Sequence, residues 1–211
     1  MATLSDANFT GLRTSLGEWL HRSDLTDTDL GNFIFLFEKE FNREMRVRNM
    51  EAETTIASVS GALPNPSDWQ EWKNITFVQN GDNYQLSAVS EEEANMLYGT
   101  KTPGTPQAYV VRGSNTVIAP APDSSSYSYK TRYFQGVPAL SGSATTNWLL
   151  NAFPDCYLHG AMAQASAFTY EDQRALGWKA IKEETFDKIK KMAKRQSFSG
   201  GVPVMRADNV I

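Results

Sequence analysis

The chain has few of the residues from which proteins build disulfides and metal centres. Its 211 residues include one cysteine and two histidines, which excludes an internal disulfide framework and leaves little for a metal site. No apolar run approaches the roughly 18 residues of a membrane span. The N-terminus lacks the charged-then-apolar pattern of a signal peptide. These absences predict a soluble protein, made in the cytoplasm, with no cofactor, no metal and no membrane contact.

Charge and motif content narrow the function further. Twenty-four acidic and twenty basic residues give a net charge of −4, so bulk charge does not indicate a nucleic-acid-binding protein. With 41% hydrophobic and 21% charged residues, the composition is that of a globular protein with ample aromatic material for a core. The P-loop, zincin, nucleophile-elbow and paired CxxC motifs are absent. The sequence therefore carries no enzyme signature.

Helical periodicity marks both ends of the chain. Apolar residues recur at helical spacing from Phe9 to Leu20 and from Leu30 to Met45, the second run preceded by a capping box of Thr26 and Asp29. Helical spacing returns after residue 145 and continues to about residue 197, with Pro154 expected to kink or restart the helix. The pattern predicts helices before and after a different middle region.

The middle region reads as short strands. β-Branched and aromatic runs at residues 75–78, 84–86, 109–111, 116–118 and 127–133 are separated by Gly, Asn, Asp and Pro, which predicts a small antiparallel sheet. Ser90 with Glu93 predicts one short helix within it. The predicted fold class is α+β: a helical bundle from the N- and C-terminal helices, with the β-rich region inserted. The predicted segments are 1–50, 51–142, 143–197 and an extended C-terminal arm, 198–211.

Cys156 and His159 are the one pair that could carry chemistry. They lie three residues apart on a predicted helix, so they could meet as a thiol and a base. No orienting third group or oxyanion donor is evident nearby, and apolar neighbours favour a buried thiol and a packed imidazole. The acidic residues at 91–93 and the basic residues at 188–195 are explained more simply by helix dipoles than by a cation or phosphate site. We therefore predict no catalytic, cofactor-binding or metal-binding residues.

Two features suggest assembly. The second predicted helix is apolar almost all round in its middle, and a later helix carries a run of small residues that would let another backbone approach. For the second helix and for the C-terminal arm alike, packing within the chain's own core is an equally good explanation. The candidate residues for a subunit interface are Phe33, Phe35, Phe37, Gly160 and Ala163.

The C-terminal arm is the second feature. Gly200 and Gly201 separate an apolar segment from the last helix. Two residues apart, Val202 and Val204 would point to the same side of an extended chain, as docking by strand addition requires. The candidate residues for binding a partner or a neighbouring subunit are Val202, Val204, Met205, Arg206 and Ile211.

Eight short blocks stand along the chain in a fixed order and span roughly residues 15 to 180. The blocks are WLHRSDLT (19–26), FI (33–34), RVRNME (46–51), ALP (62–64), IAPAP (118–122), PAL (138–140), TNWLL (146–150) and PDCYLHG (154–160). Together they resemble the head-to-tail adaptor proteins of tailed double-stranded-DNA bacteriophages. His21 stands where we expect Asn, residues 65–108 match little beyond length, and no block covers the arm.

This resemblance implies a structural virion protein at the head-tail junction, not an enzyme. It implies a ring, usually of twelve copies, beneath the portal protein, with a helical body and a β-rich insertion. The C-terminal arm would reach the portal, and the other face would receive the next tail component, a nozzle or tail-completion protein. Genomic DNA would pass through the lumen during ejection without sequence recognition. Two alternatives stay open: a small hydrolase that uses Cys156 and His159, and a monomeric module whose insertion binds a ligand.

Overall fold

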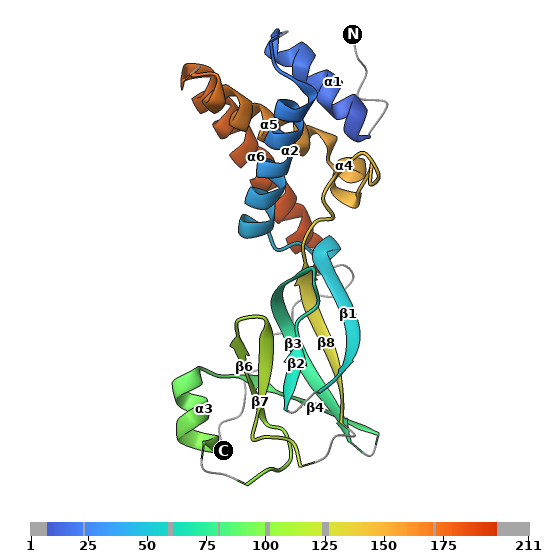
Figure 1. Ribbon diagram of the computed structural model, residues 1–211, viewed down its shortest axis with the longest axis vertical. Coiled ribbons are helices and arrows are strands. Elements are labelled where there is room, and N and C mark those ends of the chain that lie inside the picture. The colour runs from blue at the N-terminus through green and yellow to red at the C-terminus, as the bar shows by residue number, and fades with distance from the viewer. Residues whose placement is uncertain are drawn as a thin grey trace. The chain divides into compact units, whose positions relative to one another are not determined.

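The computed structural model describes residues 8–22, 24–58, 61–79, 81–99, 102–123, 127–170 and 172–197. The chain forms two compact units (Figure 1). The first combines the two ends of the chain, Met1–Asn49 and Val137–Ile211, and the second is Met50–Gly136. We call them the helical unit and the β unit. The α+β class predicted from the sequence is confirmed.

The helical unit is built around α5, against which α1, α2, α4 and α6 pack (Figure 1). The bounds of its helices are α1 Phe9–Leu20, α2 Asp27–Glu44, α4 Trp148–Ala152, α5 Pro154–Phe168 and α6 Asp172–Ser197. The predicted capping box is present: the Thr26 hydroxyl accepts from the Asp29 amide, and the Asp29 carboxylate accepts from the Thr26 amide. Pro154 occupies the first turn of α5, so it restarts the helix where the sequence allowed either a kink or a restart.

Aromatic rings fill the centre of the helical unit. The ring of Phe37 on α2 lies 5.2 Å from that of Tyr157 and 6.2 Å from that of Phe186, measured between centroids. Gly160 on α5 makes this packing possible. A Cβ atom at Gly160 would overlap the Phe37 ring, with the ring Cγ only 2.7 Å away.

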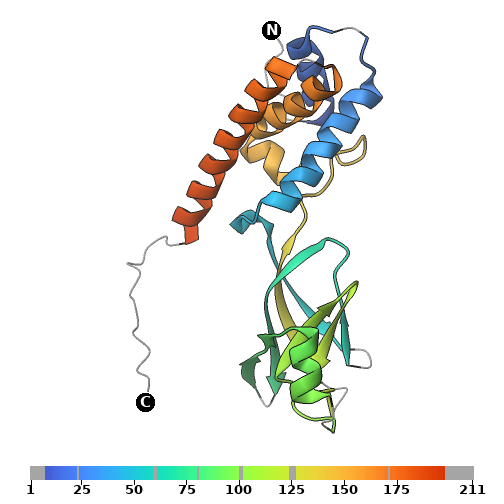
Figure 2. The same cartoon turned by 90° about the vertical axis from the view of Figure 1, so that its left-hand side faces the viewer.

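The β unit contains two four-stranded sheets, with strand orders β1-β8-β3-β4 and β2-β7-β6-β5. The strands are β1 Glu51–Ala57, β2 Ala62–Pro64, β3 Trp69–Gln79, β4 Asp82–Gln85, β5 Ser87–Ala88, β6 Ala108–Arg112, β7 Asn115–Ala119 and β8 Ser128–Gln135. A 3-10 turn, Arg48–Met50, precedes β1, and the predicted short helix is α3, Glu91–Tyr98, which packs on β6 (Figure 2).

The prediction of one small antiparallel sheet is therefore wrong in two respects. The described residues form two sheets, and β5 pairs with β6 in parallel. The strands that the sequence did not predict include β2 and β5, three and two residues long, which are too short to show an alternating pattern.

Both sheets contribute to one core in the β unit. Trp72 and Phe77 from β3, Ile118 from β7 and Tyr129 from β8 are buried together. The indole N–H of Trp72 donates to the Thr116 hydroxyl across the two sheets at 2.7 Å. The two sheets are thus joined by a buried hydrogen bond as well as by apolar packing.

Candidate interaction surfaces

A buried polar network holds the segment between β8 and α4 onto the helical unit. Oε1 of Glu38, on α2, accepts hydrogen bonds from the Leu140 amide at 2.9 Å and the Tyr157 hydroxyl at 2.8 Å. Nδ2 of Asn147 donates to the Tyr157 hydroxyl at 2.6 Å and to the Pro138 carbonyl at 2.7 Å. Burial raises the pKa of Glu38. The hydrogen bonds that its carboxylate accepts from the Leu140 amide and the Tyr157 hydroxyl oppose that shift.

Three of the blocks that carry the family resemblance meet in this network. PAL supplies two backbone groups, TNWLL supplies Asn147, and PDCYLHG supplies Tyr157. Asn147 also caps α4, because its Oδ1 accepts from the Leu150 amide at 2.8 Å. These three blocks therefore stabilise the helical unit.

The same contacts show where the inserted region ends. The Val137 amide donates to the Asn42 side chain at 2.9 Å, and the Leu140 amide donates to Glu38. Residues 137–142, which the sequence analysis assigned to the insertion, thus lie with the helical unit. The sequence analysis did not identify Glu38 as important. The feature that could have identified it is the position of a carboxylate in the middle of the apolar run of α2.

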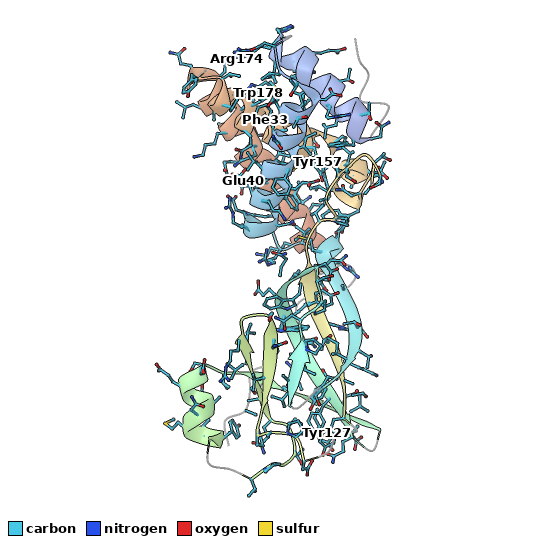
Figure 3. The ribbon with its side chains drawn as sticks, in the orientation of Figure 1. Phe33, Glu40, Tyr127, Tyr157, Arg174 and Trp178 are labelled. Carbon is cyan, nitrogen blue, oxygen red and sulfur yellow. The ribbon has the colours of Figure 1, made fainter. Side chains whose placement is uncertain are left out.

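Cys156 and His159 pack as structural residues. Cys156 is completely buried, and burial raises the pKa of its thiol, which keeps it protonated at neutral pH. His159 turns toward α6, where its Nδ1 lies 3.2 Å from the Thr185 hydroxyl and its ring stacks on Trp178 (labelled in Figure 3) at 5.9 Å. Burial lowers the pKa of His159. These surroundings favour the structural interpretation over a hydrolytic pair.

Within the described ranges, no three His, Cys, Asp or Glu side chains are grouped so that they could hold a metal ion. Glu91, from the acidic turn of α3, pairs with Arg112 at 2.8 Å. None of the helices in the described part of the chain is long and apolar enough to cross a membrane.

The predicted interface residues separate into two groups. Phe33 and Phe37 are buried in the helical unit, and Gly160 lies against the Phe37 ring. Their burial does not support the prediction that they contact a neighbour, because their own core already covers them. Phe35 is 48% exposed beneath the Lys39 ammonium, 5.0 Å from its ring centroid.

Ala163 lines a groove between α2, α5 and α6 with a volume of about 490 Å³, which we call the α2-α5-α6 groove. Small side chains keep it open, and the Leu176 side chain at its edge is 69% exposed. The buried ammonium of Lys182 pairs with Glu40 (labelled in Figure 3) at 2.6 Å, which compensates that charge, and the other ammonium in the lining belongs to the exposed Lys179. What the groove offers a partner is mainly apolar surface. Further lining residues are Gln164, Ala167, Ala175 and Lys179.

A second pocket, of about 270 Å³, lies at the end of α6, and we call it the α6-end pocket. Met192, one of its lining residues, is 38% exposed. The predicted arm residues Val202, Val204, Met205, Arg206 and Ile211 follow α6 in the chain, but they lie outside the described residues. Its lining also includes Trp148, Phe153, Ile189 and Gln196.

The surface of the β unit differs in character. On the sheet that contains β8, Arg132 pairs with Glu53 at 2.7 Å. A hollow of about 290 Å³ beside this pair is lined by charged and uncharged polar side chains. Large apolar groups are exposed on α3, where Met96 is 79% exposed.

The buried thiol and the buried polar network serve the fold of the helical unit. The apolar hollows on its surface are the features suited to binding another chain. A family model described as SU10 adaptor protein matches residues 7–206. The chain belongs to this family of bacteriophage adaptor proteins and is a structural component of the virion. The match includes residues 65–108 of the β unit and the first part of the arm, which the motif blocks did not cover. No curated protein matches the chain.

Proposed function

We propose that this adaptor forms a ring of twelve copies beneath the portal protein, joins the phage head to the tail and extends the DNA channel. Membership of the adaptor family over residues 7–206 carries this proposal. Genomic DNA passes through the lumen without sequence recognition. The net charge of −4 per chain suits this role, because a strong phosphate-binding surface would retard the DNA.

Two partners follow from the proposal. The arm, residues 198–211, binds the portal protein through Val202, Val204, Met205, Arg206 and Ile211. The opposite side of the ring receives the next tail component, a nozzle or tail-completion protein. The ring resides at the head-tail junction of the virion after synthesis in the host cytoplasm.

The helical unit supplies the contact between subunits. In a closed ring each subunit uses two different surfaces, one for each neighbour. The α2-α5-α6 groove is suited to be one of them, since interface centres are apolar and poor in uncompensated charge. Phe35 is suited to the other. It lies five residues before Glu40 and so about 140° away from it around α2.

Electron microscopy of the protein mixed with the portal of its phage tests the ring directly. The expected result is one ring with twelvefold symmetry beneath each portal. Portals that stay bare at saturating adaptor, or adaptor that remains monomeric beside them, would overturn the proposal.

A truncation after Ser199 tests the arm. The shortened chain should keep the helix content and thermal transition of the full chain, because the described helices end at Ser197. It should lose most of its occupancy on the portal. Full occupancy of the portal by the shortened chain would assign the joint to the helical unit alone.

A further inference from the structure

The α6-end pocket lies where the described chain stops. Ile189 forms part of its buried wall, Phe153 is half-buried in it, and Met192 is partly open to solvent. An apolar hollow of this kind gains stability from an apolar occupant. The nearest part of the sequence outside the described residues is the arm.

The last turn of α6, which precedes the arm in the chain, lies beside this pocket. Nη1 of Arg48 donates to the Gln196 carbonyl at 3.1 Å, which ties the last turn of α6 to the segment after α2. Gln196 itself lines the pocket. The chain that follows Ser197 therefore begins at the edge of the pocket.

The length and sequence of the arm allow it to fold back. Four residues, 198–201, separate α6 from Val202, and two of them are the glycines that best tolerate a reversal. The pocket face of α6 from Ile189 to Gln196 is about 10 Å long at 1.5 Å per residue. Residues 202–205 in extended form also cover about 10 Å.

The side chains fit as well. In an extended segment Val202 and Val204 point to the same side, toward the pocket, and Pro203 between them points away. Pro203 has no amide hydrogen, so a position against helix side chains, where no strand partner is needed, suits it better than the middle of a sheet.

We propose that, before assembly, the α6-end pocket binds residues 202–205 of the same chain. The free energy gained by burying two valines is similar in size to the cost of ordering the segment, so the arm binds weakly and can leave. Its transfer to the portal rests on the function proposed above, whereas its binding in the pocket does not.

Disulfide trapping in the full-length chain tests this binding. Met192→Cys is combined with Val204→Cys, and the matched control combines Lys191→Cys with Val204→Cys. Lys191 is one residue away but about 100° around α6, and it is not among the pocket residues. The native Cys156 does not compete, because it is buried and its pKa is raised.

The Met192 pair should form an intramolecular disulfide at least about ten times faster than the control pair, since binding raises the local concentration of the second thiol. Equal rates would overturn the proposal. So would a product that consists mainly of covalent dimers, which would assign the pocket to the arm of a second copy.

Methyl NMR of the chain without engineered cysteines gives an independent measurement. Val204→Asp should shift the Met192 methyl resonance and leave that of Met45, which is buried elsewhere, unchanged. Asn209→Asp adds the same charge farther along the arm and should leave both unchanged. An unaltered Met192 resonance in Val204→Asp would contradict the proposal. Neither experiment involves the portal, so failure here is distinct from failure of the proposed function.

Discussion

The helical unit and the β unit differ in where they place charged side chains. In the helical unit Glu38 and Lys182 are buried and bonded to specific partners. In the β unit, the Arg132–Glu53 pair lies on the outer face of a sheet, with both side chains more than half exposed. Losing one partner of a buried group leaves the other unsatisfied, whereas an exposed pair exchanges its partner for water. We therefore expect substitution of a buried charge in the helical unit to cost more stability than substitution of this exposed pair in the β unit.

The units also differ in the surface they leave open. Alanine and leucine make up half of the lining of the α2-α5-α6 groove, while the hollow on the β unit is lined by charged, amide and hydroxyl side chains alone. A rigid scaffold with an apolar hollow is what a subunit interface requires. This difference is why we assign the ring contacts to the helical unit.

The largest effect on stability is expected from Gly160→Ala. Alanine normally stabilises a helix relative to glycine by about 1 kcal/mol, but here its methyl group would overlap the buried Phe37 ring. We expect a net loss of about 3 kcal/mol in the free energy of unfolding, measured by chemical denaturation. Gly177→Ala on α6 is the control, because a Cβ there meets nothing within 4 Å. It should be neutral or stabilising. An equal change in the free energy of unfolding for the two variants would show that Gly160 and the Phe37 ring are not tightly packed.

Cys156→Ser should have a smaller effect. The substitution places a hydroxyl in the apolar surroundings of the buried thiol, and burying a polar group there costs about 1–2 kcal/mol of stability. Rings on the portal should form as before, and Cys156→Ala should also assemble. A variant with unchanged stability that had lost a measurable hydrolytic activity would revive the hydrolase alternative.

Glu38→Gln should change how the free energy of unfolding depends on pH more than it changes the magnitude of that free energy. Burial raises the pKa of Glu38 in the folded chain, above the value of about 4.3 expected on unfolding. The folded state then binds more protons than the unfolded state between these two values, so the wild-type free energy of unfolding falls as pH rises through that window. Glu38→Gln should remove this decline. Tyr157→Phe, which deletes a hydrogen bond that lowers the pKa of Glu38, should enlarge it. Parallel curves for wild type and Glu38→Gln would contradict the assignment.

The smallest effect is expected in the β unit. Arg132→Ala removes an exposed pair with Glu53, and such pairs contribute little because water and salt screen them. Thermal unfolding in low and high salt should be nearly unchanged. A large, salt-dependent loss would show that charge on this face stabilises the β unit.

The sequence predicted the elements with strong local signals. The capping box at Thr26, the helix beginning after Ser90 and the restart at Pro154 are each determined within a few residues, and each was found. The split into two sheets depends on pairing between distant segments, including β2 and β5, which are too short to carry a pattern.

Burial around α2 was harder to predict for a different reason. Because apolar residues surround the middle of this helix, periodicity could not distinguish Phe37, which is buried, from Phe35, which is exposed. Glu38 was missed because its partners come from segments about a hundred residues later. The family resemblance located those segments, but it did not show that they meet.

The most direct test of the account is the occupancy of portal by three charge variants of the adaptor, counted by electron microscopy at equal concentration. Leu176→Glu alters the α2-α5-α6 groove, Phe35→Glu alters the other face of α2, and Met96→Glu alters an apolar side chain on the β unit that is more exposed than either. All three should fold with wild-type thermal transitions. We predict that the first two lose the ring and that Met96→Glu keeps it. Intact rings from Leu176→Glu and Phe35→Glu, with rings lost in Met96→Glu, would contradict the assignment of the subunit contacts to the helical unit.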